Sequence, residues 1–144
     1  MAPYLSNKGY KKMFSNITDL AGRIFLSLLF LTAGLSKLGA GYDGTAQYMT
    51  AMGISSALLP VVIATEILGA IAIIVGFQTR IVAFLLAGFS MLSALFFHLD
   101  FADQMQSILF MKNIAIAGGF LVLVSHGAKR FSIDAAFATH NRGI

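Results

Sequence analysis

Four ionisable side chains lie within or at the ends of long apolar stretches of this sequence. They are Lys37, Glu66, His98 and Lys112, and Lys112 is followed directly by Asn113. A charge near the middle of a bilayer costs at least about 2.5–3.5 kcal/mol on insertion scales, so such residues mark candidate functional sites. A carboxylate accepts a proton, an imidazole titrates near neutral pH, and ammonium groups donate hydrogen bonds. We interpret the set as a candidate binding site for an anion or a polar headgroup.

The composition indicates that a membrane surrounds these residues. Of the 144 residues, 58% are hydrophobic and 11% are charged, against roughly 45–50% and ~25% in an ordinary soluble domain. A chain of this length cannot bury that much apolar surface in water. The mean hydropathy of +0.82 excludes a disordered tail and a nucleic-acid-binding module. Because the chain has no cysteine, thiol redox chemistry and Fe–S clusters are also excluded.

The apolar residues form four runs, each close to the ~20 residues that a helix needs to cross a bilayer. The fold class predicted is all-α, a four-helix integral membrane bundle in one domain over residues 1–144. A basic N-terminal arm precedes the first helix and a short tail follows the last. In the one long connection, residues 45–52 predict a short surface helix with Tyr48 and Met49 turned toward lipid. The predicted spans cover residues 20–38, 58–77, 81–99 and 108–124.

The distribution of Lys and Arg predicts the orientation of the bundle. Eight of the 10 Lys and Arg residues fall on the side that holds both termini and the turn at residues 78–80. Cytoplasmic flanks carry the positive excess, so both termini are predicted to be cytoplasmic. Arg23, near the inner end of the first span, is interpreted as an interfacial anchor whose head reaches toward water.

Depth and helical phase predict which polar residues meet. Glu66 lies 11 residues before Phe77, and Lys112 lies 12 residues before Val124, so both are some 16–18 Å from the inner boundary. Glu66 and Lys112 are therefore predicted to pair. On each helix the polar residue shares a face with small residues, as membrane helix contacts do; for Lys112 this face holds Ala115 and Gly119, while Asn113 turns toward a different neighbour.

Two interpretations of the cluster stay open. The charges of Glu66 and Lys112 could simply neutralise each other and fix the register of the helices. Alternatively, because Lys37 and His98 add positive charge at a similar level, the cluster could bind a ligand. No haem is predicted, because His98 and His126, near span ends, lie a bilayer thickness apart and cannot bind one iron. No other metal site is predicted either, because the outer half offers one histidine and one glutamate with lysines between them, which is not a set of metal ligands.

Several short motifs together resemble the DoxX family of small bacterial membrane proteins. The resemblance covers residues 21–134 and implies a multi-pass bundle in the bacterial inner membrane. The family is named after a membrane subunit of a thiosulfate:quinone oxidoreductase, so it implies a quinone as a candidate ligand and a redox protein or a second copy as a candidate partner. The motifs are Arg23-Ile24-Phe25, Gly34-Leu35-Ser36-Lys37, Gly41-Tyr42-Asp43-Gly44-Thr45, Glu66-Ile67-Leu68-Gly69, Gly76-Phe77-Gln78-Thr79-Arg80, Lys112-Asn113 and Ser132-Ile133-Asp134.

Two classes of function follow from the residues and the resemblance. In the first, the chain is a quinone-interacting membrane subunit of an oxidoreductase, without a covalently bound cofactor. In the second, it is a scaffold, a lipid-handling protein or a small-anion-binding protein without catalytic activity. The ligand candidates in either class are Lys37, Glu66, His98, Lys112 and Asn113. Whether the chain is itself an enzyme stays open at this point.

Overall fold

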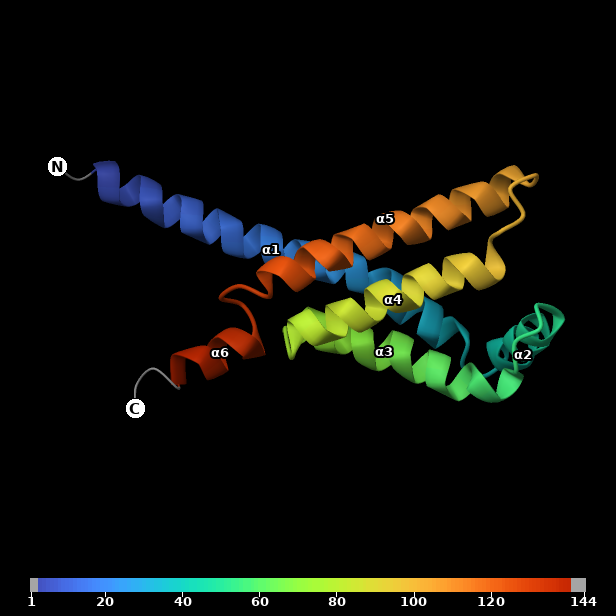
Figure 1. Ribbon diagram of the computed structural model, residues 1–144. Coiled ribbons are helices and arrows are strands. Elements are labelled where there is room, and N and C mark those ends of the chain that lie inside the picture. The colour runs from blue at the N-terminus through green and yellow to red at the C-terminus, as the bar shows by residue number, and fades with distance from the viewer. Residues whose placement is uncertain (1–2, 141–144) are drawn as a thin grey trace.

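A computed structural model describes residues 3–140 and shows a bundle of long helices (Figure 1). Four of these helices are long and apolar enough to cross a membrane, and the described residues contain no strand. The prediction of an all-α bundle with four spans is therefore confirmed. The elements are α1 (Pro3–Ser36), α2 (Gly41–Ala51), the 3-10 turn η1 (Ser56–Leu58), α3 (Leu59–Val75), α4 (Thr79–Phe97), α5 (Gln104–His126) and α6 (Ile133–His140).

The helices begin and end where local chemistry favours it. Asp103 precedes α5 and its carboxylate accepts a hydrogen bond from the backbone N–H of Met105, which is the usual role of an N-cap. Between α3 and α4, Gly76 has a left-handed backbone with φ of 70°, a conformation that glycine adopts without steric cost. The chain therefore reverses within three residues, close to the turn expected at residues 78–80, and α3 and α4 form a hairpin.

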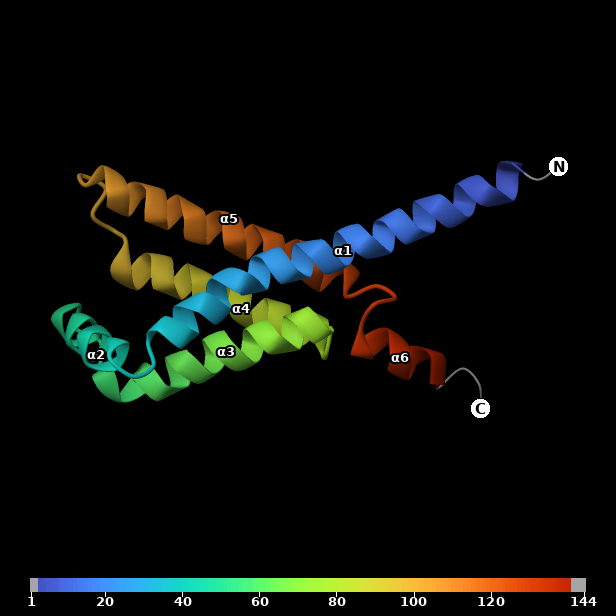
Figure 2. The same ribbon diagram turned by 180° about the vertical axis from the view of Figure 1, so that it is seen from behind.

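Helix α1 begins much earlier than the sequence analysis predicted. The expected basic arm is helical, and α1 runs unbroken for 34 residues, or about 51 Å at the usual rise per residue. The hydrocarbon core is only about 30 Å thick. The N-terminal half of α1 projects beyond the other helices in both views (Figures 1 and 2).

The core lies where the four spanning helices cross. Helix α1 packs along α3, and α4 packs along α5. Phe30 of α1 joins these two pairs, because its ring meets the ring of Phe120 edge-on at 5.4 Å and that of Phe89 at 6.1 Å. Gly34 lets α1 approach α3 closely, since a Cβ at this position would lie 2.6 Å from Ile67 Cγ1. Small residues at such crossings are typical of membrane bundles.

The short helix α2 covers the ends of α3 and α4 that lie opposite the α3–α4 turn. We call this end of the bundle the outer end and the end with the turn the inner end, as names of position within the bundle. Helix α2 forms over Gly41–Ala51, somewhat earlier than the predicted residues 45–52. Met49 is buried and packs with Leu59 and Ile63, and the ring of Tyr48 stacks on Phe97 at 5.5 Å. The expectation that these two side chains face lipid is therefore wrong for Met49, because the ends of α3 and α4 offer it an apolar surface.

Candidate functional site

One cavity of about 430 Å³ lies in the outer half of the bundle, below α2. All five residues proposed from the sequence line it: Lys37, Glu66, His98, Lys112 and Asn113. They come from α1, α3, α4 and α5 or from the residues that directly follow these helices. The remaining lining is mostly apolar and includes Phe30, Tyr48, Met49, Phe89, Phe96 and Phe97. Such a combination of an apolar wall and a few polar groups is typical of small-molecule sites.

The charged pair in this cavity joins Glu66 to Lys37. Lys37 Nζ donates to both carboxylate oxygens of Glu66, at 2.8 and 2.9 Å, and to the carbonyl oxygen of Ala33 at 3.1 Å. Glu66 is only 5% exposed. The predicted pairing of Glu66 with Lys112 is therefore wrong. Glu66 and Lys112 were placed at the same depth along their helices, but depth alone does not decide which cation reaches the carboxylate. The side chain of Lys37, which follows the last turn of α1, extends back along that helix to Glu66.

Asn113, and not Lys112, lies on the packed face of α5. Asn113 is buried, while Lys112 is exposed and forms no ion pair among the described residues. The packed face of α5 carries Asn113, Ala117 and Phe120, not the predicted face with Ala115 and Gly119. Lys112 nevertheless lines the cavity, so it supplies a cation that no carboxylate neutralises.

His98 stands at the outer end of α4. Its Nδ1 lies 2.7 Å from the side-chain Oε1 of Gln106 on α5. This contact orients the imidazole and leaves Nε2 without a hydrogen bond to any described residue. A ring nitrogen that is free to donate or accept can bind a ligand atom or exchange a proton with it.

A second polar centre lies at the inner end of the bundle and is built on Arg23. The side chain is 1% exposed, so its interpretation as an interfacial anchor is wrong. Its guanidinium donates to Asp19 at 3.1 Å, to the carbonyl oxygens of Ile73 and Ile74 at 3.2 and 2.8 Å, and to that of Phe131 at 2.5 Å. Arg23 thus binds two carbonyl groups in the last turn of α3, of which that of Ile73 also accepts a hydrogen bond from the backbone N–H of Gly76 at 3.2 Å.

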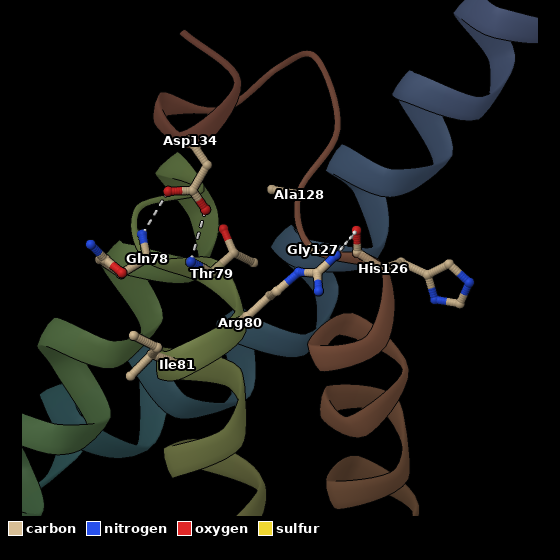
Figure 3. Close-up of a pocket in the computed structure, with 8 residues that line it drawn as sticks. All are labelled: Gln78, Thr79, Arg80, Ile81, His126, Gly127, Ala128 and Asp134. Carbon is tan, nitrogen blue, oxygen red and sulfur yellow. Dashed lines mark hydrogen bonds between the residues drawn. The ribbon is translucent and has the colours of Figure 1, made fainter. Parts of the chain in front are cut away.

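The segment after α5 folds back over this inner end (Figure 3). Asp134 of α6 accepts hydrogen bonds from the backbone N–H groups of Gln78 and Thr79, at 2.8 and 2.9 Å. It thereby caps the N-terminus of a different helix, α4. Arg80 donates to the carbonyl oxygen of His126 at 3.4 Å. These residues surround a second cavity of about 410 Å³. Their hydrogen bonds hold the C-terminal segment to the bundle.

The contacts of Asp19 and Asp134 and the buried hydroxyl groups of the bundle were not predicted from the sequence. The motif at residues 132–134 was noted only for its resemblance to a family. Its helix-capping role was not foreseen, because Asp134 lies 56 residues from Gln78 in the chain. A carboxylate next to the start of a predicted helix indicates an N-cap. A carboxylate from a distant segment cannot be recognised in this way, because it does not stand next to the helix in the sequence.

Comparisons with known proteins agree with the architecture. The DoxX family pattern matches residues 18–99. The chain is 46% identical to the inner membrane protein YqjF of Escherichia coli (strain K12) over 123 residues, which cover 85% of this chain and 94% of that protein. It is 36% identical to the inner membrane protein YphA of the same organism, over 80% of this chain and 86% of that protein.

Over a shorter stretch, the chain is also similar to a protein of Bacillus subtilis (strain 168) named putative oxidoreductase CatD. The two are 35% identical over 71 residues, which cover 49% of this chain and 52% of that protein. No solved structure matches the chain. The four candidate spans and the two inner membrane relatives place the protein in the inner membrane as a multi-pass protein. With the family pattern covering more than half of its length, the chain belongs to the DoxX family.

Proposed function

We propose that this protein is a membrane subunit of an oxidoreductase and that its outer cavity binds the polar head of a quinone. One observation carries the proposal: within a single cavity of about 430 Å³, aromatic walls enclose an ion pair, an oriented imidazole and an uncompensated ammonium group. A quinone head is a flat apolar ring with polar oxygen atoms. It needs apolar walls for the ring and hydrogen-bond donors for the oxygens.

The position of the cavity suits a ligand that arrives from the bilayer. Leu92 and Phe96 of α4 both line the cavity and are more than half exposed on the outer surface of the bundle. That surface faces lipid in a spanning helix. An apolar tail can therefore leave between the helices at this point while the head remains among the polar residues.

The polar residues then have separate roles. Lys112 donates a hydrogen bond to a ring oxygen without giving up a partner, since it forms no ion pair among the described residues. The Glu66 carboxylate, which Lys37 keeps in place, and Nε2 of His98 are groups beside the ring that can accept a proton and pass it on. A quinone supplies two-electron chemistry and takes up two protons on reduction. Because the chain has no cysteine pair to pass electrons, the proposal assigns their delivery to a partner protein.

The relative named putative oxidoreductase CatD supports this class of function. The alternative is that the cavity binds an acidic lipid head or a small anion without any redox role. The unpaired charge of Lys112 favours that second function, because an anion would neutralise it.

Extraction of the purified protein separates these possibilities. The protein is purified in detergent from quinone-containing membranes, and the extract is analysed for quinones and lipids by mass spectrometry. We expect the parent and a Lys11→Met control to retain quinone and a Lys112→Met variant to lose most of it. Lys112 is exposed, so its loss should leave the fold intact. Retention of an acidic lipid in place of quinone, or equal quinone in Lys112→Met and parent, would refute the proposal.

A further inference from the structure

We propose that Ser90 forms the inner end of the ligand site and binds a second oxygen of the ligand. The ligand class that follows is a six-membered ring with oxygen atoms on opposite corners, inserted end-on between His98 and Ser90. This inference rests on the proposed function and extends it, because it names the orientation of the ring and the residue that selects it.

The state of the Ser90 hydroxyl is the first observation. Ser90 is 1% exposed, it lines the outer cavity, and its Oγ has no hydrogen-bond partner among the described residues. Several other hydroxyls in these helices donate to the preceding turn, as Ser36 does to the carbonyl oxygen of Ala33 at 2.8 Å and Ser125 to that of Val122 at 2.7 Å. A buried polar group without a partner is costly. One that lines a cavity is available to a ligand.

The spacing along α4 is the second observation. Ser90 lies within α4 and His98 is the C-cap of that helix, eight residues further along the chain. Their Cα atoms are therefore about 12 Å apart along the helix axis, and both residues line the cavity. Two hydrogen bonds of about 2.8 Å each take up about half of an interval of that length, so a ligand several ångströms long fits between the two residues. The remaining distance accommodates a single six-membered ring with an oxygen at each end. The oxygens of a phosphate or carboxylate share one central atom and lie too close together to reach both residues.

The chemistry of the two ends is compatible with both redox forms of such a ring. A serine hydroxyl can donate to a carbonyl oxygen and accept from a phenolic hydroxyl. Because Nδ1 of His98 donates to Oε1 of Gln106, Nε2 accepts from a phenolic hydroxyl when the ring is neutral and donates to a carbonyl oxygen when the ring is an imidazolium. The site would therefore hold the ring before and after reduction without a change in side-chain positions.

The test compares Ser90→Ala with Ser27→Ala in the detergent-purified full-length protein. Ser27 is an ideal control, because it is also buried with an unpartnered hydroxyl but lines neither described cavity. Two probes are titrated: a benzoquinone with a short alkyl tail, and a phenol with the same tail that lacks the second ring oxygen. Both variants should unfold at or slightly above the temperature of the parent, because each loses a hydroxyl that had no partner.

The expected binding result is a selective loss. Ser90→Ala should weaken quinone binding about fivefold to tenfold, the equivalent of one hydrogen bond, while phenol binding and both affinities of Ser27→Ala stay at the parent values. If Ser90→Ala binds the quinone as the parent does while Lys112→Met binds it poorly, the inference fails and the proposed function stands. If the parent binds neither probe, or Lys112→Met has no effect, both fail.

Discussion

Replacing Lys37 with Met should destabilise the bundle far more than replacing Lys112 with Met. Lys37 donates to both oxygens of Glu66 at 2.8 and 2.9 Å, and the Glu66 side chain is 7% exposed. Without Lys37, this buried carboxylate has no cationic partner, which costs on the order of 3–5 kcal/mol. The Lys112 ammonium is exposed, and surface substitutions usually change stability by about 0.5 kcal/mol or less.

Thermal unfolding in detergent, followed by helical circular dichroism, measures the difference. A loss of about 3–5 kcal/mol corresponds to a decrease in Tm of roughly 6–20 °C for a chain of this size. A double-mutant cycle with Glu66→Gln adds a second readout, since removing both partners should cost less than the sum of the single changes. Additive effects, or a Lys112→Met variant as unstable as Lys37→Met, would refute the pairing.

Three further predictions concern topology, packing and capping. With both termini cytoplasmic, a single cysteine at Ala57 should react with an impermeant thiol reagent on intact cells, and one at Thr139 only after permeabilisation; the reverse pattern would invert the orientation. Gly34→Ala should lower the Tm, because its Cβ would lie 2.6 Å from a side-chain atom on α3, whereas Gly88→Ala, with nothing within 4 Å, should raise stability by about 0.5–1 kcal/mol. Asp134→Ala should cost roughly 0.5–2 kcal/mol, as the loss of a cap does, and expose the C-terminal segment to limited proteolysis; cleavage rates equal to those of the parent would exclude the capping role.

The sequence was sufficient to predict the spans and the packed faces of three of them. Apolar runs near 20 residues long specify membrane helices because the bilayer leaves the backbone no other way to satisfy its hydrogen bonds. The face of α3 with Glu66, Ala70 and Ile73 is buried as expected. On α5 the small residues did not identify the packed face correctly. That helix carries alanine and glycine around much of its circumference, so small residues there do not single out one face.

Contacts between distant segments were beyond the reach of the sequence. The general rule for an arginine near the end of a span predicts an interfacial anchor at Arg23. Instead, the side chain donates to carbonyl oxygens of Ile73 and Phe131, which lie 50 and 108 residues away in the chain. Nor does spacing along single helices show which lysine reaches Glu66. That choice depends on how α1 and α3 cross, which Gly34 permits through its lack of a side chain.

The length of α1 makes this small protein unusually convenient to enlarge for imaging. From Pro3 to residue 14 the helix extends away from the bundle (Figures 1 and 2), a rod of about 18 Å, and it meets the rest of the protein at Asn16, which is buried. A soluble helical domain spliced into this rod as one continuous helix would be held rigidly outside the detergent micelle. Removing or adding one residue at the splice would turn that domain by about 100° and shift it by about 1.5 Å, so a series of junctions would place a recognisable particle in known orientations.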